Sequence, residues 1–112
     1  MDSRNSAAGH AETQLELAKR RERIDAVDRK LVELLNERTR IAHEIGHIKK
    51  EAGLPVYEPS REERVLAHVA EMNPGPISES ALRHIFDAIM KEMRKIQEDP
   101  MAPEGPVKDH WR

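Results

Sequence analysis

Residues 13–53 read TQLELAKRRERIDAVDRKLVELLNERTRIAHEIGHIKKEAG, and the organisation of the whole chain follows from this stretch. It contains no proline, and its only internal glycine is Gly46. Apolar residues recur in it at helical spacing along seven-residue columns. One column holds Ile24, Leu31, Arg38, Ile45 and Ala52, and the next holds Val27, Leu34, Ile41 and Ile48. The pattern predicts one long helix with a wide apolar stripe.

The ends of this helix carry their own signals. Thr13 and Glu16 form a T-x-x-E capping box, and Gly53 followed by Pro55 stops the helix. At the usual rise per residue the helix would be roughly 58 Å long. A globule of this chain length has a radius of gyration of about 13 Å, so the chain cannot bury the stripe by itself. We therefore predict an intertwined homodimer in which a second copy covers the stripe.

Positive charges interrupt the stripe. Arg38 lies between Leu31 and Ile45 in the apolar column, and Arg21 and Lys49 lie in an adjoining column. A buried charge without a partner is costly, so an anionic ligand held between helices would explain them. The side chains could instead reach solvent or pair with carboxylates elsewhere in the chain.

The rest of the chain predicts two shorter helices. One should begin near Pro59 or Ser60, where Ser60 and Glu63 offer a capping box, and should end at the break NPGP. The other should be capped by Ser78 and end before Pro100. The fold class predicted is all-α, with three helices and no strand.

The predicted organisation has three parts. Residues 1–12 should be a disordered segment, residues 13–98 one helical domain, and residues 99–112 a flexible tail, because both ends are polar or rich in proline.

Composition excludes several classes of function. Charged residues make up 36% of the chain, aromatic residues 3%, and the formal net charge is -2. The small net charge gives no reason to expect nucleic acid or a membrane as a partner. The absence of cysteine excludes thiol nucleophiles and thiolate metal sites. The chain has no long apolar run or signal-like segment, so we expect a cytoplasmic protein.

One motif resembles a metal site, but its position on the helix argues against metal binding. Residues 43–47 read HEIGH and match the zinc-protease pattern H-E-x-x-H. Ile45 lies on the apolar stripe, which should turn His43 and His47 toward the polar side, and no third ligand is evident. We predict no metal site.

The remaining polar oddities form one candidate site. Its members are Arg21, Arg38, Lys49, Glu58, Arg61, Glu62 and Gln97. The set contains cations, carboxylates and one amide, but no credible nucleophile or acid–base pair. Such a pocket suits a small dicarboxylate and a reaction that depends on orientation and electrostatics.

Ordered motifs in the chain resemble the all-helical chorismate mutases. They are Arg21-Glu22-Arg23-Ile24, Val27-Asp28, Leu34 to Arg38, Glu44 to Lys49, Pro55-Val56 through Arg61-Glu62, Ile85-Phe86 and Gln97. The resemblance covers about residues 15–98. It implies the rearrangement of chorismate to prephenate without a cofactor, in an intertwined helical dimer whose two sites are shared between chains.

The resemblance also implies roles for the site residues. Arg38, with Arg21 of the opposite chain, would bind the two substrate carboxylates. Lys49 and Gln97 would donate to the ether oxygen, where negative charge develops as the C–O bond breaks.

Further roles fall on the segment that follows the long helix. Glu62 and the backbone near Glu58 would hold the ring hydroxyl, and Arg61 would support the carboxylate side. Two positions depart from the family pattern: Glu58 stands where many members have aspartate, and Met93 where many have a substrate-binding serine.

Other functions fit parts of the pattern. An isochorismate pyruvate lyase shares the fold, although lyases that resemble this chain lack the Arg61-Glu62 pair. A non-catalytic helical dimer would act as a regulatory module, but it would not need Arg38 within an apolar column. The sequence is also compatible with docking on another enzyme of aromatic amino-acid biosynthesis.

Overall fold

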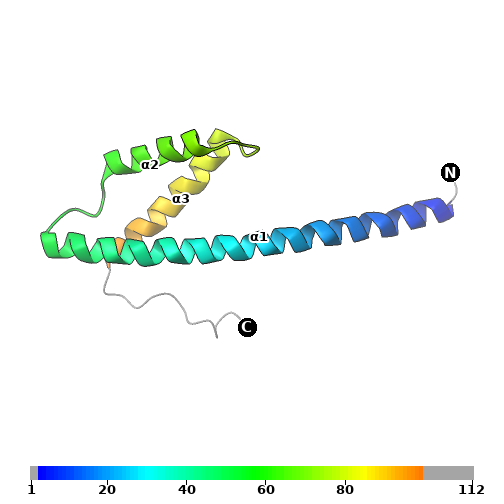
Figure 1. The fold of residues 1–112 in the computed structure, drawn as a ribbon, viewed down its shortest axis with the longest axis horizontal. Coiled ribbons are helices and arrows are strands. Elements are labelled where there is room, and N and C mark those ends of the chain that lie inside the picture. The colour runs from blue at the N-terminus through cyan, green and yellow to red at the C-terminus, as the bar shows by residue number, and fades with distance from the viewer. Residues whose placement is uncertain (1–2, 100–112) are drawn as a thin grey trace, which may run out of the picture. The chain divides into compact units, whose positions relative to one another are not determined.

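The computed structural model describes residues 3–99, and the side chains of residues 8–99. It contains helices α1 (Ser3–Ala52), α2 (Pro59–Met72) and α3 (Glu79–Glu98), shown in Figure 1. Residues 3–99 contain no strand, so the predicted all-α fold with three helices is confirmed. None of the helices among the described residues combines the length and the apolarity that a membrane span requires. Most of the predicted tail, residues 100–112, lies outside the described residues.

The described chain divides into two units after Arg38. The first unit is the N-terminal part of α1. The second unit contains the remainder of α1 together with α2 and α3. Its small core consists of Ala42, Val69, Met90 and Met93. The candidate site described below is built within the second unit.

The start of α1 corrects the prediction. The helix begins at Ser3 and not at Thr13, so it includes residues 3–12, which we expected to be disordered. The Thr13 hydroxyl donates to the carbonyl of Gly9 at 2.8 Å, one turn back, as a hydroxyl inside a helix does. Residues 7, 8 and 11 are alanines, the best helix formers, and no proline intervenes. A capping pattern therefore does not stop a helix whose preceding residues are also helix formers.

The end of α1 follows the prediction. The amide of Leu54 donates to the carbonyl of Lys49 at 2.8 Å, and Gly53 has a φ of 67°. This is the helix ending that favours glycine, because a side chain is strained in the left-handed region. The chain then turns away from the helix at Gly53 and leads to α2.

The C-terminal part of α1 buries only part of its predicted stripe within its own unit. Ala42 and Gly46 are buried, and His43 and His47 are half-buried. The isoleucines of the stripe, Ile41, Ile45 and Ile48, are 48%, 40% and 63% exposed. Our prediction that both histidines face the polar side is therefore wrong. The side of α1 that is covered within the unit therefore carries Ala42 and Gly46, whereas the three isoleucines are exposed.

Helix α2 begins at Pro59, the first helical position that proline favours. Its N-cap is Glu58, which makes no side-chain capping bond, so the predicted Ser60–Glu63 capping box does not form. The carbonyl of Glu58 accepts from the amides of Arg61 and Glu62, both at 3.1 Å. Helix α2 packs against α3.

The turn between α2 and α3 is held by Asn73. Its side chain accepts from the amide of Gly75 at 2.9 Å and donates to the carbonyl of Ile77 at 2.8 Å. Ser78 then caps α3 as predicted, because its hydroxyl accepts from the amide of Ala81 at 3.1 Å. These local bonds define where α3 begins.

Candidate active site

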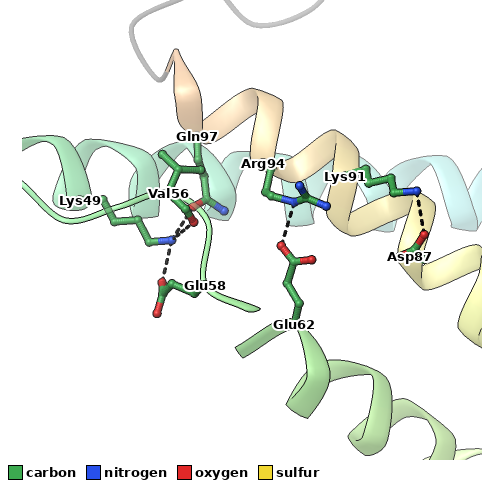
Figure 2. Close-up of polar contacts among 8 residues, drawn as sticks. All are labelled: Lys49, Val56, Glu58, Glu62, Asp87, Lys91, Arg94 and Gln97. Atoms are coloured by element: carbon green, nitrogen blue, oxygen red, sulfur yellow. Dashed lines mark hydrogen bonds and ion pairs between the residues drawn. The ribbon is translucent and has the colours of Figure 1, made fainter. Parts of the chain in front are cut away.

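The ammonium group of Lys49 is the centre of the candidate site. Its Nζ donates to the carbonyl of Val56 and to Oε1 of Gln97, each at 2.8 Å, and lies 2.7 Å from Oε1 of Glu58 (Figure 2). The lysine side chain is only 11% exposed. An ammonium group has three donors, so these three acceptors use all of them.

Three separate elements bring these groups together. Lys49 lies in the last turn of α1, and Val56 and Glu58 belong to the segment between α1 and α2. Gln97 lies in the last turn of α3. The reversal at Gly53 returns the chain to Lys49, and Ser78 sets the start of the helix that carries Gln97. The structure thus brings together Lys49, Glu58 and Gln97, three of the residues singled out from the sequence.

The contact with Lys49 also determines how the Gln97 amide is oriented. An ammonium group can only donate, so the amide atom that faces it must be the oxygen. Nε2 of Gln97 then points away from Lys49, as Figure 2 shows. Lys49 and Gln97 together therefore offer a cation and a separate amide N–H donor that the lysine does not occupy.

Glu58 is the most accessible partner of Lys49. Its side chain is 47% exposed. The hydrogen bond from Lys49 lowers the pKa of the Glu58 carboxyl below its usual value of 4.5, and the positive charge of Lys49 adds to this effect. The charges of Arg64 and Arg61 contribute smaller effects in the same direction. Glu58 is therefore held as a carboxylate that can still move into solvent.

A second ion pair lies beside the first. Nε of Arg94 on α3 is 2.9 Å from Oε2 of Glu62 on α2, and the two side chains are 29% and 19% exposed. The distance is short, yet this buried Nε has no aligned hydrogen bond. The guanidinium carbon of Arg94 also lies 4.7 Å from the centre of the Tyr57 ring. The sequence predicted Glu62 as a site residue, but it did not predict Arg94.

A signal for Arg94 does exist in the sequence. It precedes Gln97 by three residues, so the two lie one turn apart on the same side of α3. Lysine and arginine are common on helices, however, and Lys91 and Lys95 flank it. Choosing among these three cations requires knowing which of them faces Glu62.

The remaining predicted residues are Arg61, Arg21 and Arg38. Arg61 is exposed in the first turn of α2. Arg21, exposed, and Arg38, half-buried, lie on α1 in the other unit. Met93, at the family's serine position, is 6% exposed and accepts a weak hydrogen bond from the Thr39 hydroxyl at 3.9 Å.

The arrangement suits the binding and polarisation of an oxygen-rich anion. It offers a nearly buried cation, an amide donor and a carboxylate in close proximity. Among the residues that the structure describes, no group of three or more histidine or acidic side chains is placed to hold a metal ion. The groups present can orient a small molecule and stabilise charge that develops on it.

Comparison with known proteins identifies the family of the chain. The family model described as chorismate mutase type II matches residues 20–98. The chain is 37% identical over 79 residues to a bifunctional chorismate mutase/prephenate dehydratase of Aquifex aeolicus, covering 67% of this chain and 22% of that protein. It is 27% identical over 82 residues to a chorismate mutase of Methanocaldococcus jannaschii, covering 72% and 83% of the two chains.

Comparison with solved structures indicates the same family. A solved structure of chorismate mutase (form II) from Thermus thermophilus matches with a TM-score of 0.72 and 38% identity, covering 74% of this chain and 94% of that one. The chain spans only about a quarter or less of the bifunctional relatives, 22% of the Aquifex protein and 25% of one from Pseudomonas aeruginosa. The family model spans most of the chain, and the chain belongs to the type II chorismate mutase family.

Proposed function

We propose that the protein catalyses the rearrangement of chorismate to prephenate, a step toward phenylalanine and tyrosine. The observation that carries this proposal is the nearly buried Lys49 ammonium bonded to Gln97, whose amide donor points away from it. Once the Glu58 carboxylate leaves Lys49, both groups would donate to one ether oxygen. The proposal needs no cofactor and no covalent intermediate.

The chemistry requires little from the protein except orientation and charge. Within one substrate molecule the ether C–O bond breaks while a C–C bond forms, and negative charge grows on the ether oxygen. Lys49 and Nε2 of Gln97 would stabilise that charge in a pocket that excludes most water. A rate gain of about 10⁶ corresponds to about 8 kcal/mol, of which two such donors can supply a part.

Substrate binding would displace Glu58 from Lys49. All three donors of the ammonium group are engaged, and Glu58 is the acceptor with the greatest exposure. The Val56 acceptor is a backbone carbonyl, and the Gln97 side chain is carried by α3, so neither can leave Lys49 as easily as Glu58. The ether oxygen would therefore take the place of the Glu58 carboxylate.

The remaining roles involve a second copy of the chain. Arg38, with Arg21 of the second copy, would bind the two carboxylates of chorismate, and Arg61 would add positive charge on that side. The Glu62 carboxylate would accept a hydrogen bond from the ring hydroxyl, and the backbone near Glu58 would donate one to it. We propose a homodimer because apolar side chains along α1 are exposed in the single chain. Docking on another pathway enzyme and a cytoplasmic location stay predictions.

The test is turnover of chorismate by the purified protein. We would follow its loss by absorbance and identify prephenate after acid conversion to phenylpyruvate. Lys49→Ala should lower kcat/KM by roughly 100-fold or more, because it removes a charged donor at the ether oxygen. Lys50→Ala removes the same charge from the next residue, which is exposed, and should leave activity unchanged.

Two outcomes would contradict the proposal. If wild-type protein released pyruvate from isochorismate and left chorismate untouched, the protein would be a lyase. If Lys50→Ala reduced turnover as much as Lys49→Ala, the assignment of Lys49 to the ether oxygen would be wrong.

A further inference from the structure

The ion pair between Arg94 and Glu62 differs from most others in the described chain. Lys19–Glu16, Arg83–Glu79, Lys91–Asp87 and Lys95–Glu92 join residues three or four apart on one helix, and their side chains are 45% to 70% exposed. Such pairs contribute little to stability. Arg94 and Glu62 join α3 to α2, and at 29% and 19% exposure they are more shielded from water.

Arg94 is also held from a second direction. Its guanidinium carbon lies 4.7 Å from the centre of the Tyr57 ring, within the range of a cation–π interaction. Tyr57 precedes Glu58, the partner of Lys49, and Arg94 precedes Gln97 by one turn. Arg94 therefore contacts the edge of the site on the α1–α2 segment and on α2, and it shares the face of α3 that carries Gln97.

Arg94 and Glu62 form a short ion pair, but the Nε–H of Arg94 is not aligned for a hydrogen bond. The two atoms are 2.9 Å apart, yet the buried Nε of Arg94 has no aligned acceptor. A buried donor left in this state is uncommon. The arginine thus fixes the Glu62 carboxylate by charge while leaving it able to accept an aligned bond from another donor.

We propose that Arg94 is a positioning residue that orients Glu62 to accept a hydrogen bond from the ring hydroxyl of the substrate. This inference rests on the proposed function, which gives Glu62 that hydroxyl. The planar guanidinium, held between the Tyr57 ring and the carboxylate, limits rotation of the Glu62 side chain. Arg94 itself touches no reacting atom.

A merely structural bridge between α2 and α3 would behave differently. It would affect folding and every substrate equally. A positioning role acts only through the hydroxyl that Glu62 binds. An analogue of chorismate that lacks the ring hydroxyl separates the two cases.

The experiment compares Arg94→Gln and Arg94→Lys with wild type on both substrates. Arg94→Gln should lower kcat/KM for chorismate about tenfold, mainly through a higher KM, as expected when a hydrogen bond to a charged group is weakened. The same variant should leave kcat/KM for the hydroxyl-free analogue unchanged. Arg94→Lys keeps the charge and should recover part of the loss. In a Glu62→Gln background, Arg94→Gln should have little further effect.

Lys91→Gln is the matched control, because it removes a cation from α3 whose partner, Asp87, lies on the same helix at 3.0 Å (Figure 2). It should leave both substrates unaffected. Equal losses on the two substrates, or no loss at all in Arg94→Gln, would overturn the role of Arg94 while the mutase activity of the wild type stood. A wild type inactive on chorismate would instead overturn the proposed function, and the role of Arg94 with it.

Discussion

Lys49 shows how one side chain can be charged and nearly buried at the same time. The Lys49 side chain is only 11% exposed, but a carbonyl, an amide oxygen and a carboxylate accept from its ammonium group and replace the water that it loses. The position of Lys49 beside an apolar column predicted an anionic partner. Within the chain that partner is Glu58, and our proposal replaces it with the substrate.

The pairing of Glu58 with Lys49 predicts a dependence of stability on pH. The hydrogen bond and the charge of Lys49 lower the Glu58 carboxyl pKa, so ionised Glu58 stabilises the folded state above the unfolded pKa, near 4.5. This contribution is lost as the pH falls through the lower folded value. The melting temperature of wild type should therefore exceed that of Glu58→Gln at neutral pH, and the difference should shrink as the pH falls below 4.5. A gap between the two that widened on acidification would contradict the pairing.

The orientation of Gln97 predicts the pH dependence of a variant. In Gln97→Glu a carboxylate would accept from Lys49 but could not donate to the ether oxygen, whereas the protonated acid could do both. Activity at neutral pH should fall by roughly 100-fold and rise as the pH is lowered. A pH–rate profile of kcat/KM measures this. A profile parallel to that of wild type would remove Gln97 from the ether oxygen.

The helices illustrate which ends can be read from local chemistry. Glycine at 53, proline at 59 and serine at 78 mark helix boundaries where we expected them, because each acts through the backbone within one turn. The start of α1 was misjudged, since Thr13 bonds to Gly9 inside a longer helix. A capping residue permits a helix to begin, but it cannot stop helix formers before it from extending the helix.

The cap of α3 can be tested by its effect on stability. Ser78→Ala removes the acceptor for the Ala81 amide and should lower the free energy of unfolding by about 1 kcal/mol. Ser80→Ala is the control, because Ser80 lies inside the helix and alanine is the better helix former there. Urea unfolding of both variants measures the difference. Equal stabilities would show that the Ser78 hydroxyl does not contribute as a cap.

The molecule as a whole leaves an unusual amount of apolar surface uncovered. In residues 1–38, Ile24, Val27, Leu31 and Leu34 are 51% to 60% exposed, and this unit has no second element against which to bury them among the described residues. Burying one leucine is worth about 1.5–3 kcal/mol. A second copy of α1 would supply the missing surface, which is the physical basis of the proposed dimer.

The dimer predicts the result of a charge placed on this surface. Leu34→Glu occurs twice in a symmetric pair, so it should weaken dimerisation by roughly 100-fold or more and reduce activity, because each site would need Arg21 of the other copy. Arg29→Glu, on the opposite side of the helix, should leave the dimer intact. Sedimentation velocity over a concentration series measures both. A wild type that stayed monomeric would refute the dimer.

The long helix and the all-α class followed from helical spacing, because helical period and turn chemistry act over a few neighbours. Lys49 and Gln97 stood out because each places a polar group on an apolar face of its helix. The choice of Arg94 among the cations of α3, and the half-buried histidines of α1, did not follow. They depend on which faces of three helices meet, and that depends on contacts between residues far apart in the chain. Ala42 and Gly46 are buried in the unit, whereas the isoleucines beside them are exposed in the single chain. Periodicity identifies an apolar face, but packing between distant segments determines what covers it.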